Sequence, residues 1–281
     1  MEMIFFAGAP KCGTSTIYNC LKGREGIVVT EPKETHYFSY PEIQETYYKV
    51  PFVKTEKDYL ASFSGRGDKF LDFSPSYFSY HSACMQRMLG FSKNAKVILI
   101  LRDPVKRLLS HYYMDIRLGY KRGSVIDLIN EDSACFREYV GCSLYSDALK
   151  AFKDGYGDNL KVYIFEKLFS CEDELRDLSK FLCLKNDLTI DELREKKSNI
   201  YSSPRSSRLN YFIRNNGFLM RLWMRSPFFL KKMIKSFFMD SDANPSTLTL
   251  DVYEELRSYF VEDIKLLSDQ FPDILDFWKE K

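Results

Sequence analysis

The feature that most constrains this chain is its opening, where an apolar run leads into a turn of small residues and then into hydroxyl residues. Residues 4–9 are apolar or small, and they are followed by Pro10, Lys11, Cys12, Gly13, Thr14, Ser15 and Thr16. A strand, a tight turn and a helix start in this order predict an anion-binding loop, because backbone N–H groups at a helix N-terminus point at the ligand. Gly8 and Gly13 let the main chain approach where a Cβ would clash.

The position of the lysine separates this loop from that of an ATPase. In the pattern G-x-x-x-x-G-K-[ST] the lysine follows the second glycine. Here Thr14 follows Gly13, and Lys11 precedes it. We therefore expect the loop to bind an anion other than ATP–Mg.

A second motif follows an apolar run at residues 96–101, which reads as a strand buried on both faces of a parallel sheet. The run ends at Arg102, Asp103 and Pro104. Asp103 suits a helix N-cap and Pro104 suits the first helical position. Arg102 therefore projects from the carboxyl end of a strand, where α/β sheets hold ligands. Ser110 lies two turns into the helix, within reach of the same group.

Together the two motifs resemble the sulfotransferases that use 3′-phosphoadenosine-5′-phosphosulfate (PAPS), in particular the heparan-sulfate-type and bacterial carbohydrate branch. The first motif resembles the family's 5′-phosphosulfate loop, and Arg102-Asp103-Pro104-x-x-Arg107-x-x-Ser110 resembles its 3′-phosphate site. The resemblance implies PAPS as donor and adenosine 3′,5′-bisphosphate as product. The implied donor-binding residues are Lys11, Cys12, Gly13, Thr14, Ser15, Thr16, Arg102 and Ser110.

Two basic residues receive further roles from this resemblance. Lys11 is expected to act in catalysis, as the cation at the bridging oxygen and the transferring sulfuryl group. Arg205, in Ser203-Pro204-Arg205-Ser206, resembles a late basic element that closes over the nucleotide in bacterial relatives.

The candidate general base is Glu34, which follows the second predicted strand. The stretch from Lys33 to Phe38 resembles the K-E-x-H-F-F element of the heparan-sulfate branch, whose glutamate deprotonates the acceptor. The resemblance implies that Glu34 is the base and that Lys33 and His36 line the acceptor site. His36 is the alternative base, as a histidine is in the cytosolic branch, and a structural role for both is the third interpretation.

A third element, Asp72 to Tyr77, resembles the family's E-K-T-P-x-Y element. The sequence departs from it at Phe73, which takes the place of the lysine. Ser74 and Tyr77 are candidate acceptor contacts. The alternative is that Ser74 starts a helix and Tyr77 packs in the core.

Apolar runs alternate with helical periodicity along the chain, which predicts βαβ units and a mostly parallel sheet. We expect a single 1–281 domain with a P-loop-like three-layer α/β fold, a central sheet flanked by helices. Strands are predicted at 3–7, 26–29, 69–73, 96–101 and 160–165. Helices are predicted at 13–21, 75–89, 104–118, 144–153, 171–181 and 250–270, and a long loop at 40–56.

Composition narrows the function classes. The net charge of +2 gives no electrostatic argument for nucleic acid. Seven cysteines without C-x-x-C pairs predict reduced thiols in a reducing compartment. The chain shows no signal peptide or membrane span, whereas the Golgi sulfotransferases that it resembles carry a membrane anchor, so we expect a cytoplasmic, bacterial-type enzyme or a trimmed catalytic domain. His81 and His111 lack companions at ligand spacing, so no metal site is expected.

The segment 196–239 holds ten basic residues and no acidic one. Within it, residues 218–239 mix bulky apolar and cationic side chains. Three interpretations are open: a packed pair of helices with basic residues facing water, peripheral contact with an anionic membrane, or a site for an anionic glycan.

The resemblance to the PAPS-dependent sulfotransferases implies transfer of a sulfuryl group from PAPS to a hydroxyl of a carbohydrate or glycolipid acceptor. A nucleotide kinase is one rival, which Thr14 after Gly13 disfavours. The other is a non-catalytic membrane- or glycan-binding adaptor that kept the fold, which the combination of Lys11, Glu34, Arg102 and Ser110 disfavours.

Overall fold

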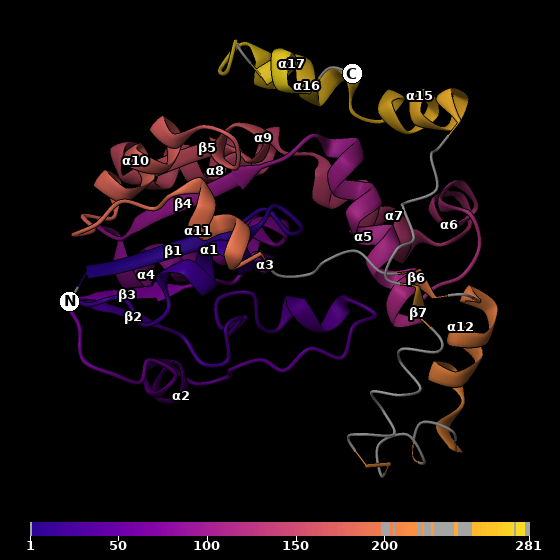
Figure 1. Ribbon diagram of the computed structural model, residues 1–281, viewed down its shortest axis with the longest axis horizontal. Coiled ribbons are helices and arrows are strands. Elements are labelled where there is room, and N and C mark those ends of the chain that lie inside the picture. Colours follow the sequence, from indigo (N-terminus) through magenta and orange to yellow (C-terminus); the bar gives the residue numbers. More distant parts are fainter. Residues whose placement is uncertain are drawn as a thin grey trace. The chain divides into compact units, whose positions relative to one another are not determined.

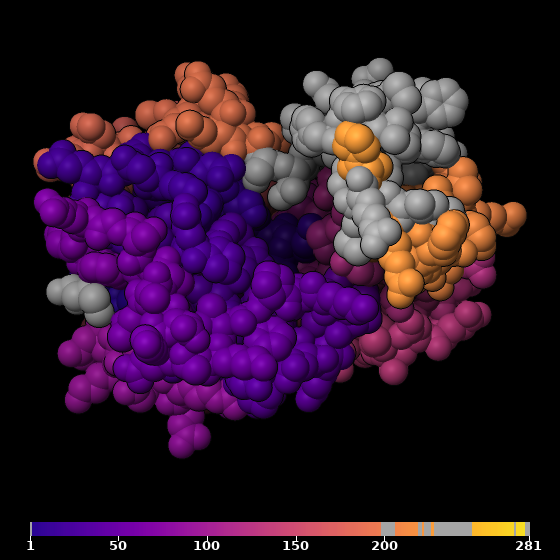
Figure 2. All heavy atoms as spheres, turned by 90° about the horizontal axis from the view of Figure 1, so that it is seen from below, coloured from indigo at the N-terminus to yellow at the C-terminus, as the bar shows by residue number. Residues whose placement is uncertain are grey.

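The structure is a computed structural model that describes residues 2–197, 203–204, 206–218, 221, 226–227, 239–240, 249–272 and 274–278. The other residues are grey in Figures 1 and 2. The chain divides into two compact units. The first comprises Met1–Arg107, Gly141–Ser198 and Phe260–Lys281, and the second comprises Leu108–Val140 and Asn199–Tyr259.

The first unit is built on a five-stranded sheet in the order β2-β3-β1-β4-β5, in which every neighbouring pair is parallel (Figure 1). The predicted strands are confirmed to within a residue or two. β1, β2 and β4 are apolar runs buried along nearly their whole length, whereas β3 and β5 each begin with partly exposed residues. Their bounds are β1 Glu2–Gly8, β2 Ile27–Val29, β3 Lys69–Asp72, β4 Lys96–Leu101 and β5 Leu160–Ile164.

The strand order explains why the motifs of the sequence meet. From β1 at the centre of the sheet the chain runs to β2 at one edge and back to β3 beside β1, and it then adds β4 and β5 on the other side of β1. β1 and β4 therefore flank the switch point, where such sheets bind ligands. Gly8 of β1 pairs in register with Leu99 of β4, and the N–H of Ala9 donates to the carbonyl of Ile100 at 2.9 Å. The segments that follow β1, β2, β3 and β4 therefore share one edge of the sheet.

Helices flank this sheet, as expected for the α/β class, with α1 packing on α11, α4 on α8, and α3 against β1. The helices of the first unit are α1 Thr14–Leu21, α2 Glu56–Ala61, α3 Ser76–Ser79, α4 His81–Ser92, α8 Ser146–Tyr156, α9 Phe165–Leu168, α10 Glu172–Phe181, α11 Ile190–Glu195, α16 Val261–Ser268 and α17 Ile274–Phe277. Single turns of 3₁₀ helix occupy Glu42–Glu45, Gly141–Ser143 and Gly157–Asn159.

Two predicted helices are each two helices in the structure. The stretch 75–89 breaks at Tyr80, whose φ of −112° and ψ of 32° leave the helical region. The stretch 250–270 divides into α15 Leu250–Ser258 and α16, and Phe260, fully buried, stands at the break with φ −113° and ψ 0°. Neither break carries a glycine or proline, so the helical periodicity concealed both.

The second unit is helical in its described part. It contains α5 Pro104–Leu118 from Leu108 onward, and α6 Val125–Glu131, α7 Ser133–Tyr139, α12 Ser207–Asn215 and α15, with β6 Ser203–Pro204 antiparallel to β7 Met239–Asp240. Asn210 of α12 ties down the end of α5 by donating to the carbonyls of Ile116 at 3.1 Å and Arg117 at 2.9 Å. Among the described helices, none has the length and apolarity needed to span a bilayer.

Candidate active site

The loop between β1 and α1 has the geometry of an anion cradle. Gly13 is the N-cap of α1 with φ of 82°, a left-handed conformation that glycine adopts readily, and no side chain caps this helix end. The amides of Thr14 and Ser15 are therefore available to a ligand, whereas that of Thr16 donates to the carbonyl of Gly13 at 3.0 Å. Gly8 passes so close to α3 that a Cβ there would lie 2.3 Å from the Cβ of Phe78. Space therefore requires glycine at position 8. Gly13 is required by its conformation and also by space, because a Cβ there would lie 2.6 Å from the Phe169 ring.

Arg102 joins the second motif to this loop. Its Nη1 donates to the carbonyl oxygen of Lys11 at 3.2 Å, and its guanidinium lies 4.7 Å from the centre of the Phe165 ring. Its Nε is buried and has no hydrogen-bond partner in the part of the chain that the structure describes. A planar cation with an unused donor beside a cradle of amides suits an anionic ligand, because guanidinium binds phosphate oxygens in pairs.

Asp103 starts the helix after β4 as the sequence predicts. Its Oδ1 accepts from the N–H of Lys106 at 2.9 Å, and α5 begins at Pro104. A residue that the sequence did not single out, Glu166, holds the same segment. Its Oε1 accepts from the N–H of Asp103 at 3.3 Å, and its Oε2 accepts from the indole Nε1 of Trp278 at 3.1 Å.

Burial raises the pKa of Glu166, and the charge of Arg102 opposes that shift. The available signal for Glu166 was its position directly after the predicted strand 160–165, at the same sheet edge as the other motifs. Its two partners come from segments 63 and 112 residues away, which no local pattern could reveal.

Cys12 contributes its backbone rather than its thiol to this loop. Its side chain is fully buried, and Sγ lies 3.5 Å from the carbonyl oxygen of Pro10. Burial raises the pKa of the thiol to about 12, although Arg102 and Arg107 act in the opposite direction. Cys12 is therefore a neutral thiol at physiological pH.

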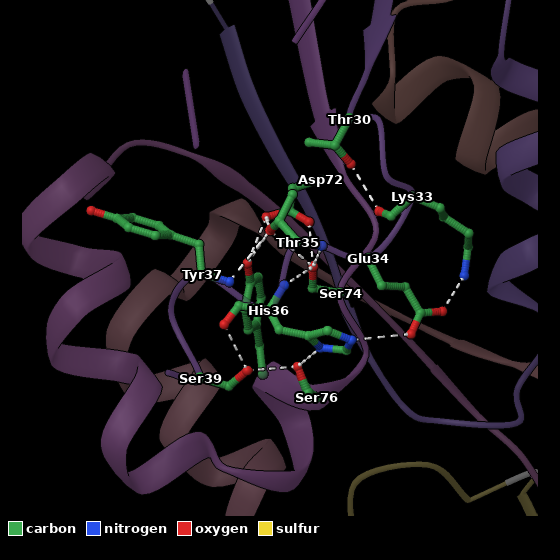
Figure 3. A network of polar contacts seen from close by, with 11 residues as sticks. Thr30, Lys33, Glu34, Thr35, His36, Tyr37, Ser39, Asp72, Ser74 and Ser76 are labelled. Atoms are coloured by element: carbon green, nitrogen blue, oxygen red, sulfur yellow. Dashed lines mark hydrogen bonds and ion pairs between the residues drawn. The ribbon is translucent and has the colours of Figure 1, made fainter. Parts of the chain in front are cut away.

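Lys33, Glu34 and His36 come together after β2 (Figure 3). The Nζ of Lys33 lies 2.6 Å from Oε1 of Glu34, and the Nε2 of His36 lies 3.7 Å from Oε2. The Glu34 side chain is 41% exposed, whereas that of His36 is 7% exposed. The carboxylate thus faces an open surface with a cation on one oxygen and an imidazole near the other.

Asp72, at the end of β3, is the buried carboxylate that anchors the turn carrying Glu34. It is fully buried and accepts hydrogen bonds from the hydroxyls of Ser74 (2.6 Å), Tyr77 (2.6 Å), Tyr59 (3.0 Å) and Thr35 (3.1 Å). Burial raises the pKa of Asp72, and the four hydrogen bonds oppose that shift. Ser74 also accepts from the N–H of Thr35 at 3.0 Å. The network therefore fixes the residue next to Glu34.

Ser74 and Tyr77, predicted as acceptor contacts, are fully buried in this network. Through their hydrogen bonds to Asp72, and that of Ser74 with the N–H of Thr35, both side chains support the turn that carries Glu34. Asp72 and Tyr59 were not singled out as site residues. A carboxylate that ends an apolar strand run just before a Ser-Pro pair was the signal that could have indicated Asp72.

His36 has a second set of partners on the side away from Glu34. Its Nδ1 lies 2.8 Å from Oγ of Ser76, which lies 2.8 Å from Oγ of Ser39, and Ser39 donates to the carbonyl of His36 at 3.1 Å. Burial, and secondarily the charge of Lys33, lowers the pKa of His36, while Glu34 raises it. The imidazole is thus held neutral. The sequence did not indicate Ser39 or Ser76.

The predicted loop at 40–56 contains a cavity of about 460 Å³. The loop is tied back to the candidate base, because the N–H of Val53 donates to the carbonyl of Thr35 at 2.9 Å. This hydrogen bond joins the residue after Phe52, which lines the cavity, to the residue after Glu34. It is lined by Ile43, Gln44, Tyr48, Lys49, Val50, Pro51 and Phe52.

Two predicted donor-site residues are not brought to this site by the described contacts. Ser110 is partly exposed on α5 and belongs to the second unit. Arg205 lies outside the described residues, as does most of the basic segment 196–239. Across the described part of the chain, no group of three or more His, Cys, Asp or Glu side chains could hold a metal ion.

The family model described as "Sulfotransferase domain" matches residues 2–209 of this chain. A solved sulfotransferase from Alicyclobacillus acidocaldarius is similar over 96% of this chain and 95% of its own, with 22% identity and a TM-score of 0.68, which supports the fold. A mouse sulfotransferase, SULT7A1, complexed with PAP (16% identity, TM-score 0.44, 92% and 89% covered) and the sulfotransferase domain from the curacin biosynthetic pathway (12%, 0.45, 92% and 96%) are more distant. No curated protein sequence matches the chain.

Proposed function

The chain belongs to the sulfotransferase domain family, and on that premise we propose that it transfers a sulfuryl group from PAPS to a hydroxyl of a carbohydrate or glycolipid. The observation that carries this proposal is the contact between Arg102 and the carbonyl of Lys11 at 3.2 Å. It joins the two motifs, 91 residues apart, that resemble the 5′-phosphosulfate loop and the 3′-phosphate site. One donor with phosphate at both ends fits two neighbouring cationic positions.

In the proposed donor site, the amides of Gly13, Thr14 and Ser15 and the hydroxyls of Thr14, Ser15 and Thr16 hold the 5′-phosphate, and the amide of Cys12 adds to the cradle. Lys11 stabilises charge on the bridging oxygen as the sulfur–oxygen bond breaks. Such preorganised groups are each worth roughly 10²–10³ in rate. Arg102 binds the 3′-phosphate with Ser110, and Arg205 closes over the nucleotide.

In the proposed acceptor site, Glu34 takes the proton of the attacking hydroxyl. Its exposed carboxylate and the neighbouring Lys33 and His36 support this assignment. The hydroxyl oxygen forms a bond to sulfur, and the bridging oxygen leaves with its electron pair on the 5′-phosphate. As in phosphoryl transfer, the protein chiefly positions the reactants in line and stabilises charge.

The cavity in the 40–56 loop supports a saccharide as acceptor. It combines the rings of Tyr48 and Phe52 with the polar side chains of Gln44 and Lys49. Mixed aromatic and polar linings of this kind bind ligands that present both ring faces and hydroxyl groups. The hydrogen bond from Val53 to the carbonyl of Thr35, the residue after Glu34, supports this assignment.

We also propose a cytoplasmic location with peripheral contact at an anionic membrane through residues 218–239. All seven cysteines are free thiols, which suits a reducing compartment. Phe212 of α12, just before this segment, is 58% exposed, and Phe218, its first residue, is 70% exposed. Exposed aromatic and basic side chains together favour binding at a lipid headgroup surface.

Isothermal titration with adenosine 3′,5′-bisphosphate tests the donor site. We expect tight binding that is the same with and without Mg²⁺, and loss of at least about tenfold in affinity for Arg102→Lys, because lysine cannot replace the bidentate guanidinium. Binding that requires Mg²⁺ would favour a kinase. ³⁵S-labelled PAPS incubated with host extract must then give a labelled product, since an adaptor would bind the nucleotide without turnover.

A further inference from the structure

The hydroxyls of Ser76 and Ser39 form a chain that begins at His36 Nδ1 and returns to the carbonyl of the same residue (Figure 3). The distances along it are 2.8 Å from Nδ1 to Ser76 Oγ, 2.8 Å from Ser76 Oγ to Ser39 Oγ, and 3.1 Å from Ser39 Oγ to the His36 oxygen. Both serines are buried, at 7% and 0% exposure. Solvent therefore does not compete for these protons.

The direction of this chain follows from counting protons. A carbonyl oxygen only accepts, so Ser39 spends its single proton on the His36 carbonyl. Ser39 must then accept a hydrogen bond from Ser76, so the single hydroxyl proton of Ser76 points at Ser39 and not at the imidazole. Ser76 is left with a lone pair toward the imidazole, so Nδ1 must carry a proton. The reverse order would leave Ser39 Oγ and the His36 oxygen 3.1 Å apart with no proton between them.

In a neutral imidazole only one nitrogen carries a proton. With the proton on Nδ1, the lone pair is on Nε2, which lies 3.7 Å from Oε2 of Glu34. That separation is longer than a hydrogen bond, so transfer between the two atoms requires the carboxylate, which is 41% exposed, to move toward Nε2. The other carboxylate oxygen, Oε1, is held by Lys33 at 2.6 Å.

We propose that Ser76 and Ser39 are positioning residues that fix His36 as the Nδ1–H tautomer, so that its Nε2 takes over the proton that Glu34 removes from the acceptor. This role rests on the proposed function. The acceptor O–H bond breaks as its oxygen bonds to sulfur, and the proton moves to Oε2 of Glu34. The O–H bond of Glu34 then breaks and an Nε2–H bond forms, which leaves an imidazolium beside a restored carboxylate.

The charges around the imidazole agree with this transfer. The Nζ of Lys33 holds Oε1 of Glu34 at 2.6 Å, so the other oxygen, Oε2, is the one that faces the imidazole. Glu34 in turn stabilises an imidazolium at 3.7 Å, whereas burial and Lys33 keep the resting ring neutral and ready to accept. The buried carboxylate of Asp72 reaches His36 only indirectly, through Ser74, whose Oγ accepts from the His36 N–H at 3.3 Å.

The tautomer can be measured without donor or acceptor, by two-bond ¹H–¹⁵N correlation spectra of protein labelled in its histidine rings. The signals lost in His36→Asn identify His36, and asparagine tolerates its φ of 53°. We expect the Nδ1–H pattern above neutral pH in the wild type. Ser76→Ala removes the acceptor of that proton and shifts most of the population to Nε2–H, and Ser76→Thr, which keeps the hydroxyl, restores the wild-type pattern.

Ser79→Ala is the matched control, because it removes a hydroxyl from the same short helix without touching the chain to His36. An Nε2–H tautomer in the wild type would overturn the proposal, even if no variant folds. With the acceptor found by ³⁵S labelling, Ser76→Ala should lower kcat by roughly tenfold with an unchanged KM for PAPS. Equal kcat in Ser76→Ala and Ser79→Ala contradicts the role, while absent PAPS turnover in the wild type contradicts the proposed function itself.

Discussion

The two carboxylate oxygens of Glu34 have different neighbours, and we expect them to have different roles. Lys33 occupies Oε1 at 2.6 Å, which holds the side chain in place, and Oε2 is turned toward His36. A base needs a fixed position and a free lone pair at once, because proton transfer requires hydrogen-bond reach. The pair of contacts supplies both conditions from residues that are adjacent or two apart in the sequence.

Glu34→Gln keeps the shape of this side chain and removes its basicity. We expect kcat to fall by roughly 10²–10⁴-fold, because general base catalysis contributes on that scale. Affinity for adenosine 3′,5′-bisphosphate, measured by titration calorimetry, should stay within about twofold of the wild type, since the donor loop is untouched. Glu31→Gln, an exposed carboxylate three residues earlier that pairs with Lys22, is the control with normal turnover. Full activity in Glu34→Gln would move the base to His36.

The strand ends are the elements that unite the site, and the sequence predicts them well. The apolar runs at β1 and β4, and the capping signal of Asp103 with Pro104, are local patterns that a single segment carries. The donors to Asp72 are different, because Thr35, Tyr59 and Tyr77 reach it from 37, 13 and 5 residues away. Such contacts depend on the three-dimensional order of β2 and β3, which no local pattern contains.

Asp72 is expected to support the turn of Glu34 as one element. Asp72→Ala leaves four buried hydroxyls without their acceptor, so the free energy of unfolding, measured by urea titration, should fall by about 3 kcal/mol or more. Asp68→Ala, an exposed carboxylate before the same strand that pairs with Lys69, should change it by less than about 0.5 kcal/mol. A similar small change in Asp72→Ala would show that the network is not structural.

The same carboxyl group gives a pH dependence with a defined sign. Burial raises the pKa of Asp72 above its ordinary 3.8, so the folded chain holds this proton to higher pH than the unfolded chain. Its contribution to stability is therefore greatest below 3.8, declines as pH rises through the folded pKa and is constant above it. Asp72→Ala should lack this decline in urea titrations across acidic pH, and an identical profile in both proteins would contradict the raised pKa.

Trp278 belongs to the last described turn of the chain, yet it reaches the end of β4 through Glu166. Trp278→Phe keeps a ring in the core and removes the indole N–H that donates to Glu166 at 3.1 Å. We expect the segment of Arg102 and Asp103 to loosen, which weakens adenosine 3′,5′-bisphosphate binding about three- to tenfold in calorimetry.

The control for Trp278→Phe is Tyr163→Phe. Tyr163 lies on β5, next to β4 in the sheet, and the change removes the hydroxyl that donates to Asp177 at 2.8 Å. Both changes should lower the free energy of unfolding by about 1 kcal/mol, since each deletes one hydrogen bond to a carboxylate. Only Trp278→Phe should weaken nucleotide binding. Equal affinities in the two variants would confine Trp278 to a packing role.

At the scale of the whole molecule, charge is segregated although the total is nearly balanced, with 41 basic and 39 acidic residues. The segment 196–239 carries ten basic residues and no acidic one, so the remainder of the chain is net acidic. The sequence reveals this asymmetry completely, because charge counting needs no structure. Helix α12 lies in the described part of this segment. Its side chains Leu209 and Phe212 are exposed one helical turn apart, and Arg208 and Arg214 flank them in the sequence.

This arrangement predicts binding to anionic membranes. We expect the full chain to co-sediment with phosphatidylserine-containing vesicles at low salt and to be released by about 0.5 M salt, because screening removes the attraction. Vesicles of pure phosphatidylcholine should bind it weakly. Phe212→Ser removes a ring that is 58% exposed and should weaken binding severalfold, since burial of apolar surface also contributes.

Leu250→Ser is the matched control, because Leu250 is equally exposed, at 58%, but begins an acidic helix with Asp251, Glu254 and Glu255. Anionic vesicles should bind this variant as they bind the wild type, since lipid of the same sign repels that helix. Equal loss in both variants would mean that any exposed apolar side chain suffices. Absence of binding at low salt would instead return the basic segment to the interpretation of packed helices whose charges face water.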